Sequence, residues 1–426
     1  MKNILKKITK LINLSCFKKK NNINYLTEQQ NIENKYNEYL ETLDKIENNQ
    51  RNKIIIVTHD LNETGAPILA YNIAKKFQTK KYDVAIISLS DGYLENKYKD
   101  LEIPVFSLHQ DHLNNKINVP EALDIIVKTL YEKGYKNAIT NTIISGLTTP
   151  ILKKYNFSII SLIHEMKTTI SLYNLKAGGF DIATYSDIIV FPDKIVQQGF
   201  EELFNVKEKK LIICPQGLYK TKENIKENYE HIYIKYNIPK NSKIIMGSGT
   251  ADYRKGIDLF LLAAHQLLLL EKDEQYHFIW TGPIINPELK AWFEWQLEIN
   301  NKKDRFHNLD FIKDKQEYQN LVTCSDIFWL TSREDPFPSV MIEALEFNTP
   351  VIAFKNSGGA NTLLQDGRGI LIDNFDINKL VTTTQELLNN KKEIKIMLKK
   401  AQTYIKKNLN FNNYIEDLEK LIKEIK

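Results

Sequence analysis

Short runs of apolar residues alternate with helix-like segments along most of this chain, and this alternation limits its fold more than any other feature. Ile54-Ile55-Ile56-Val57 is the first such run. A run this short and uniformly β-branched is typical of a strand buried on both faces of a parallel sheet. Comparable runs recur over residues 84–214 and again over 243–354, with helical segments between them. Strands that alternate with helices predict doubly wound α/β architecture.

The 426 residues provide enough chain for two such domains. We expect a Rossmann-like N-terminal domain over residues 51–225 and a second Rossmann-like domain over residues 226–408, facing each other across a cleft. Residues 409–426 carry an amphipathic pattern and are predicted to form a helix that packs back across the junction. In doubly wound domains, ligands bind at the carboxyl ends of the strands.

Residues 1–50 are predicted to form a basic, helical extension ahead of the first domain. Residues 1–20 contain seven lysines and no acidic residue, with Ile4, Leu5, Ile8 and Leu11 on one helical face. The net charge of +5 therefore comes from this segment, which argues against a basic nucleic-acid groove on the folded body. The segment fits either an anionic membrane surface or a packing site on protein, and the sequence leaves both open.

Two further observations indicate the compartment. No apolar run approaches the roughly 18 residues that a membrane-spanning helix needs. The three cysteines, Cys16, Cys214 and Cys324, are scattered and lack the spacing of metal ligands, as expected in a reducing compartment. We therefore expect a cytoplasmic protein, peripheral on the inner face of the cell membrane if residues 1–20 bind lipid.

Two loops that follow predicted strands of the first domain carry candidate ligand-binding residues. Thr64-Gly65-Ala66-Pro67 combines a glycine with a helix start, where backbone N–H groups are free to bind an anion or a hydroxyl. It is also compatible with a tight turn that binds nothing. His164 and Glu165 directly follow another strand, and histidine titrates near neutral pH. A structural histidine is the alternative interpretation.

Two loops of the second domain carry the stronger signals. In residues 247–258, a glycine-rich loop leads to Arg254-Lys255-Gly256 at a helix start, which suits a diphosphate. In residues 333–345, acidic residues follow a buried strand, two prolines fix the loop, and Glu343 lies in the next helix. The carboxylates would accept hydrogen bonds from sugar hydroxyls. Solvated basic residues, and an acid that favours the helix dipole, are the respective alternatives.

Taken together, these motifs resemble the retaining glycosyltransferases of family 4, which have the GT-B fold. The family's donor signature is an acid, seven residues and a glutamate, and Asp335 and Glu343 match it. The resemblance covers about residues 51–425. It implies transfer from a nucleotide-sugar with retention of anomeric configuration.

The resemblance also implies roles for residues of this chain. His164, Lys255, Arg254 and Asp335 would be catalytic: Lys255, helped by Arg254, would neutralise the diphosphate, Asp335 would bind donor-sugar hydroxyls and His164 would lie by the reacting sugar. Glu343 would bind the ribose. The remaining donor-binding candidates are Gly65, Gly249, Phe337, Pro338 and Ser339.

This sequence departs from the family pattern at two positions. Gly249 stands where an arginine is usual, six residues before the lysine, and Thr362 stands where an acid is common. Cations and N–H dipoles at the diphosphate would stabilise the leaving group. Because the chain lacks an Asp-x-Asp sequence, we expect no metal ion and no cofactor.

The leading hypothesis is a glycosyltransferase that builds a surface polysaccharide on a glycan or lipid-linked acceptor. A nucleotide-sugar epimerase of the same fold and a degenerate, non-catalytic partner subunit of a transferase are the alternatives. The two departures favour the degenerate subunit, whereas Lys255, Asp335 and Glu343 count against it.

Overall fold

The computed structural model describes residues 38–47, 49–108, 119–206, 209–219, 229–270, 275–284, 286–299 and 303–425. The predicted basic helix over residues 1–20 lies outside these ranges. The chain divides into two compact units. The described residues up to Val190, together with Phe200–Ile212 and the chain from Ile415, form the first unit; Phe191–Gly199 and Ile213–Tyr414 form the second.

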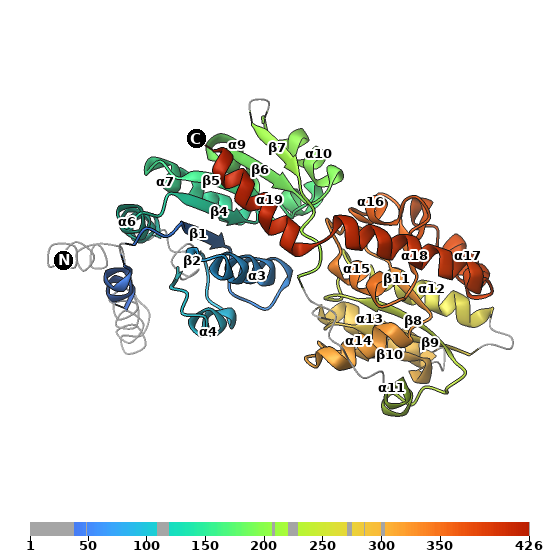
Figure 1. Ribbon diagram of the computed structural model, residues 1–426. Helices are drawn as coiled ribbons and strands as arrows, with labels where there is room; N and C mark the ends of the chain where they lie inside the picture. The colour runs from blue at the N-terminus through green and yellow to red at the C-terminus, as the bar shows by residue number, and fades with distance from the viewer. Residues whose placement is uncertain are drawn as a thin grey trace. The chain divides into compact units, whose positions relative to one another are not determined.

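A seven-stranded sheet forms the centre of the first unit, with strand order β3-β2-β1-β4-β5-β6-β7 (Figure 1). All pairings from β3 through β6 are parallel. Every residue of β1 is buried, as its β-branched sequence predicts. The strands are β1 (Lys53–Thr58), β2 (Asp83–Ser88), β3 (Val105–Ser107), β4 (Asn137–Asn141), β5 (Ser158–Leu162), β6 (Ile188–Phe191) and β7 (Lys210–Ile213).

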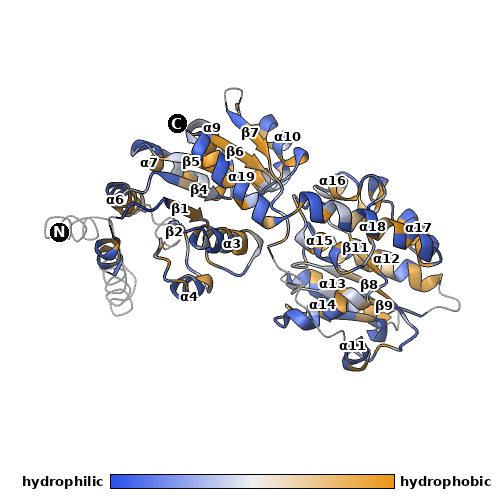
Figure 2. Cartoon of the chain, viewed as in Figure 1, coloured by the Kyte–Doolittle hydropathy of each residue, from blue (hydrophilic) through white to orange (hydrophobic). Residues whose placement is uncertain are grey.

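Helices connect these strands and cover the sheet. The described ones are α3 (Gly65–Thr79), α4 (Leu94–Lys99), α6 (Val119–Glu132), α7 (Thr149–Lys154), α8 (Lys167–Leu172), α9 (Lys176–Tyr185) and α10 (Lys194–Leu203), with a 3₁₀ turn η1 (Ile144–Thr148). Apolar side chains of β1, β2, β4 and β5 pack with those of α6 and α7 in one core cluster. The hydropathy colouring follows this arrangement, because the strands are largely apolar and the helices are mixed (Figure 2).

The second unit contains a six-stranded sheet of order β10-β9-β8-β11-β12-β13, again parallel throughout. Its strands are β8 (Lys243–Ser248), β9 (Tyr276–Thr281), β10 (Phe306–Leu309), β11 (Ile327–Leu330), β12 (Val351–Phe354) and β13 (Ile370–Ile372). Two core clusters occupy its two faces, one around α12 and one around α15. The predicted pair of doubly wound domains is thus confirmed.

The helices of the second unit alternate with its strands. They are α11 (Tyr229–Lys235), α12 (Ile257–Leu269), α13 (Pro287–Ile299), α14 (Lys315–Cys324), α15 (Ser339–Glu346), α16 (Ala360–Leu364), α17 (Ile377–Leu388) and α18 (Lys391–Asn408); the 3₁₀ turns are η2 (Lys303–Arg305) and η3 (Asp373–Phe375). The last helix, α19 (Phe411–Glu424), begins in the second unit and ends in the first. There Glu419 forms an ion pair with Lys80, the residue directly after α3, at 2.8 Å. No helix in the described ranges is long and apolar enough to cross a bilayer.

The strand order reverses direction once in each sheet. In the first sheet the reversal lies between β1 and β4, and in the second between β8 and β11. Loops that leave the carboxyl ends of two such strands diverge to opposite faces of the sheet and leave a crevice that suits a ligand. Of the candidate residues, Gly65 follows β1, Lys255 follows β8 and Asp335 follows β11. His164 follows β5, which pairs with β4.

Candidate active site

Lys255 and Asp335 form the centre of the candidate site in the second unit. Lys255 lies in the loop after β8, and Asp335 lies in the loop after β11. The ammonium Nζ of Lys255 is 2.5 Å from Oδ2 of Asp335, and the two side chains are only 15% and 7% exposed. Ser332 also donates to this carboxylate oxygen, at 3.4 Å. The two predicted residues, 80 positions apart, therefore form one partly desolvated cation–carboxylate pair.

Two close backbone approaches hold these loops in place. Gly256 has φ of +70°, and a Cβ there would lie 2.1 Å from the carbonyl oxygen of Thr331. Gly358 has φ of +136°, and a Cβ there would lie 1.8 Å from the carbonyl oxygen of Asp335. Only glycine fits a positive φ at such short distances. Glycine at these positions lets the loops after β8, β11 and β12 pack directly against one another.

Two arginine side chains form hydrogen bonds between the loops after β8 and β11. Nη1 of Arg254 donates to the carbonyl oxygen of Glu334 at 3.1 Å. The guanidinium of Arg333 binds both carboxylate oxygens of Asp258, in the first turn of α12, at 2.8 and 2.6 Å. Planar two-point pairs of this kind fix orientation as well as supply energy. Arg254 thus lies beside the Lys255–Asp335 pair, with one nitrogen already hydrogen-bonded.

Gly249 packs along the side chain of Lys255. A Cβ at Gly249 would lie 3.3 Å from Cδ and Cε of Lys255. The Gly249 N–H donates to the carbonyl oxygen of Thr281 at 2.8 Å, and its own carbonyl accepts from the Trp280 indole at 3.0 Å. In this structure the backbone of Gly249 is therefore engaged with β9, while the missing side chain leaves room for the Lys255 methylenes.

The start of α15 follows Asp335 by four residues. Phe337 is buried, Pro338 precedes the helix, and Ser339 is its first residue. No side chain caps this helix start among the residues described. Uncapped first-turn N–H groups point along the helix axis and carry partial positive charge, which suits an anion.

Glu343 is almost fully buried one turn into α15, with 3% of its surface exposed. The hydroxyl of Tyr318, on α14, faces this carboxyl group. Burial first, and the adjacent Glu343 second, raise the pKa of Tyr318 well above its usual range. Sequence inspection missed Tyr318, because a tyrosine among the polar residues of α14 gives no sign that it faces a carboxylate.

In the first unit, Gly65 opens α3 directly after the loop that follows β1. Gly65 is exposed, and a Cβ built on it would meet no protein atom within 4 Å. Thr64 provides no side-chain cap for this helix. The helix start at Gly65 is therefore open, with backbone N–H groups accessible to a ligand.

His164 lies beyond the end of β5, where a neighbouring amide fixes its ring. Its Nε2 is 2.9 Å from Oδ1 of Asn141, the last residue of β4. The carboxylate of Glu165 accepts from the N–H groups of His164, at 3.0 Å, and Ile143, at 3.1 Å. These bonds join the ends of two adjacent strands.

The electrostatics of this cluster follow from burial. Burial, with a smaller contribution from His59, lowers the pKa of His164 to about 4. Burial raises the pKa of Glu165 to about 7, against three backbone hydrogen bonds that lower it. His164 is therefore neutral at pH 7, and Glu165 titrates there.

The structure thus brings the predicted residues together in two groups, one in each unit. The loop after β8 contains Gly249, Arg254 and Lys255, and the loop after β11 contains Asp335 and leads through Phe337 and Pro338 to Ser339, the first residue of α15. Gly65 and His164 are linked in the first unit through Asn141, whose Nδ2 donates to the carbonyl oxygen of Ala66 at 2.8 Å. Asn141 and His59 were missed by sequence inspection, although Asn141 ends β4 and His59 directly follows β1. No group of three or more His, Cys, Asp or Glu side chains suited to a metal ion occurs in the described part of the chain.

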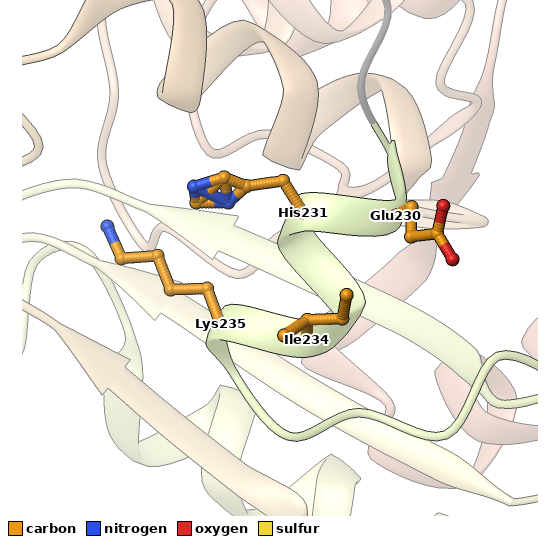
Figure 3. Close-up of a pocket in the computed structure, with 4 residues that line it drawn as sticks. All are labelled: Glu230, His231, Ile234 and Lys235. Carbon is orange, nitrogen blue, oxygen red and sulfur yellow. The ribbon is translucent and has the colours of Figure 1, made fainter.

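A surface pocket occurs elsewhere, along α11. It is lined by Glu230, His231, Ile234 and Lys235, with His231 and Lys235 extending to the same side of the helix (Figure 3). Lys235 forms an ion pair with Glu317 of α14. The helix leads toward the amino end of β8, and none of the candidate site residues lines the pocket. It is therefore separate from the strand-end site.

Two parallel sheets with candidate ligand groups at their carboxyl edges define a two-domain, Rossmann-like class of protein. Comparison with solved structures gives the same result. HepE from Anabaena, solved with UDP-glucose, has a TM-score of 0.73 at 17% identity, over 88% of this chain and 100% of that one. Sucrose-phosphate synthase from Thermosynechococcus elongatus has a TM-score of 0.70 at 17% identity, over 88% of this chain and 99% of that one. A glycosyltransferase from Rickettsia africae has a TM-score of 0.70 at 16% identity, with the same shares of the two chains covered.

Residues 228–408 match the family described as "Glycosyl transferases group 1". No curated protein matches the chain at the sequence level. The fold is GT-B, and residues 228–408 belong to the group 1 glycosyltransferases, the retaining transferases of family 4. The predicted family and enzyme class are confirmed.

Proposed function

We propose that this glycosyltransferase takes its sugar from a nucleoside diphosphate donor that binds in the second unit at Lys255, Asp335 and the start of α15. Glu343 holds the ribose, and the acceptor is a glycan or a lipid-linked sugar in surface polysaccharide synthesis. A uridine diphosphate sugar is the first donor to test, because HepE was solved with UDP-glucose.

The observation that carries this proposal is the pairing of Lys255 with Asp335 at 2.5 Å, beside the uncapped start of α15. Both lie inside the segment that matches the transferase family. A sugar diphosphate needs three kinds of group: a cation and backbone N–H groups for its phosphates, and a carboxylate that accepts a hydrogen bond from a sugar hydroxyl. No other described loop of the second unit combines all three.

The chemistry follows from the charges that develop when the sugar–phosphate bond breaks. The sugar gains positive charge, and the departing diphosphate gains negative charge. Lys255 and the N–H groups at Ser339 stabilise the diphosphate, and groups already oriented before the reaction stabilise it most effectively. Asp335 holds the sugar by a hydroxyl. The new bond forms on the face that the diphosphate leaves, so that the configuration is retained, and the acceptor proton passes to the diphosphate oxygen.

In the first unit, His164 and the open helix start at Gly65 serve the same transfer. The support is their position: Gly65 follows β1, which flanks the point where the strand order reverses, and His164 follows β5, which pairs with β4 on the other side of that point. We place the enzyme in the cytoplasm. Residues 1–20 would hold it on an anionic membrane surface where a lipid-linked acceptor is concentrated.

The test is a panel of nucleotide-sugars, first in a thermal-shift screen and then in a turnover assay with and without sugar acceptors. The proposal predicts release of the nucleoside diphosphate that depends on acceptor and persists in saturating chelator. Isomerisation of the donor without acceptor would indicate the epimerase instead. A protein that binds no donor would indicate the non-catalytic subunit.

A further inference from the structure

One side-chain amide joins the two candidate groups of the first unit. Asn141 ends β4, and its Nδ2 donates to the carbonyl oxygen of Ala66, the residue after Gly65, at 2.8 Å. Its Oδ1 lies 2.9 Å from Nε2 of His164. The amide therefore spans from the start of α3 to the loop after β5.

The orientation of this amide follows from its partners. A backbone carbonyl only accepts hydrogen bonds, so the NH₂ group of Asn141 must face Ala66. Its oxygen then faces His164. An amide oxygen also only accepts, so the His164 nitrogen opposite must carry a hydrogen. The geometry thus selects the tautomer of His164 with the proton on Nε2.

Only one ring proton is present at neutral pH. Burial and the nearby His59 lower the pKa of His164 to about 4. The titratable neighbours are His59, which follows β1 and is itself paired with Asp60, and Glu165, whose carboxylate accepts from backbone N–H groups. With Nε2 protonated, Nδ1 carries a lone pair, and no described residue hydrogen-bonds to it.

We propose that Asn141 is a positioning residue that fixes His164 as the Nε2–H tautomer and so presents Nδ1 as the acceptor of a hydrogen bond from a substrate hydroxyl. This inference rests on the proposed transferase function only for the identity of the hydroxyl. The donor sugar and the acceptor sugar are the two sources. The Glu165 carboxylate accepts from the backbone N–H groups of both His164 and Ile143, so His164 is held at its main chain as well as at the Nε2 edge of its ring.

The tautomer is measured without substrate. The full-length protein is labelled with ¹⁵N-histidine, and long-range ¹H–¹⁵N NMR at pH 7 distinguishes protonated from bare ring nitrogens; His164→Gln assigns the signals. We expect Nε2 protonated and Nδ1 bare in the wild type, and a mixture of tautomers in Asn141→Ala. Asn137→Ala, at the other end of β4, is the matched control and should leave the tautomer unchanged. A protonated Nδ1 in the wild type would overturn the proposal.

The consequence for catalysis is tested with Asn141→Asp. The carboxylate still accepts from Nε2, but it stabilises the charged ring, and an opposite charge at this distance raises a histidine pKa by roughly one unit or more. We therefore expect the acidic limb of the pH–rate profile to move up by about one pH unit, while Asn137→Asp leaves it in place. A lowered rate with an unmoved limb would mean that Asn141 is merely structural.

The source of the hydroxyl is tested with His164→Gln. A raised KM for the nucleotide-sugar alone assigns the hydroxyl to the donor, and a raised KM for the acceptor alone assigns it to the acceptor. Unchanged values for both would overturn the role of Nδ1. If no donor is turned over at all, the transferase proposal fails, whereas the tautomer measurement still decides the role of Asn141.

Discussion

The ammonium of Lys255 and the carboxylate of Asp335 lie 2.5 Å apart, although the strands that carry them are the first and fourth of the second sheet in chain order. Each side chain neutralises the charge of the other. We propose that a sugar diphosphate replaces this contact, with its phosphate oxygens against the ammonium and a sugar hydroxyl against the carboxylate. On this proposal, the pair keeps both groups oriented until the donor binds.

Replacing Lys255 by alanine should slow transfer by about 10²–10³-fold, the usual loss when one group that stabilises developing charge is removed. Steady-state kinetics with the active donor measure this. Lys243→Ala is the matched control, because Lys243 forms an ion pair with Asp326 at 3.4 Å near the other end of β8. It should leave kcat within about twofold, since Lys243 lies at the opposite end of the strand from the site and a partly exposed pair contributes little. Equal losses in both variants would show that Lys255 acts only through stability.

Replacing Glu343 by alanine should mainly raise the KM for the nucleotide-sugar. A lost charge-assisted hydrogen bond to the ribose corresponds to about 1.5–3 kcal/mol, or roughly 10–100-fold in affinity. Because Glu343 is buried against Tyr318, the unfolding midpoint of the variant must be measured alongside the kinetics. A well-folded variant with unchanged KM would remove Glu343 from the donor site.

Two glycine substitutions should affect different properties, donor binding in one case and stability in the other. Gly65→Ala meets no protein atom within 4 Å, so the variant should unfold at the wild-type temperature but bind donor less well. Gly358→Ala places Cβ 1.8 Å from the Asp335 carbonyl oxygen at φ of +136°, so it should lose about 1–3 kcal/mol of stability. Thermal unfolding and donor titration of both variants test this. Normal donor binding by Gly65→Ala would mean that no ligand approaches this helix start.

The sequence predicted most of the fold because its central strands are nearly uniform apolar runs. The apolar runs at residues 188–191, 327–330 and 351–354 coincide with the strands β6, β11 and β12. The strands β10 and β13 were missed, since β10 contains His307 and Asn308 and β13 has only three residues. Edge strands have one side without a neighbour, so polar residues are tolerated there and the apolar signal weakens.

The candidate site was predictable only in part. Lys255 and Asp335 follow strands and match a known spacing, so the sequence pointed to both. Asn141 and Tyr318 were missed, because their importance depends on which side chains they face after folding. A hydrogen-bond partner 23 or 25 residues away leaves no periodic pattern in the sequence.

The stability of the protein should fall as the pH drops from 7 to 5. Burial lowers the pKa values of His164 and His277 to about 4, from 6.5, so the unfolded chain takes up more protons over this range. Each of the two histidines then lowers the free energy of unfolding by about 1–2 kcal/mol at pH 5. Glu165, whose pKa burial raises to about 7, takes up a proton in the folded state over the same range and so offsets part of this loss of stability. Urea unfolding at pH 7 and 5 should show the loss, and His277→Gln should reduce it; equal stability at both pH values would contradict this account.

Deleting residues 1–20 should abolish binding to anionic vesicles and leave transfer to a soluble acceptor nearly unchanged. Each lysine near an anionic surface contributes about 1 kcal/mol, and salt screens this attraction. Sedimentation with phosphatidylserine vesicles, at low and high salt, measures the binding. If the full-length protein never binds vesicles and the truncated one changes its oligomeric state, residues 1–20 are an assembly element instead.

The central claim, that Lys255 belongs to a diphosphate site, is tested most directly by calorimetric titration of UDP, GDP and ADP, each compared with its monophosphate. We predict that at least one diphosphate binds roughly tenfold or more tightly than its monophosphate, as one charge-assisted contact implies. Lys255→Ala should abolish this preference, and Lys243→Ala should retain it. A preference that survives Lys255→Ala, or the absence of any preference in the wild type, would contradict the account.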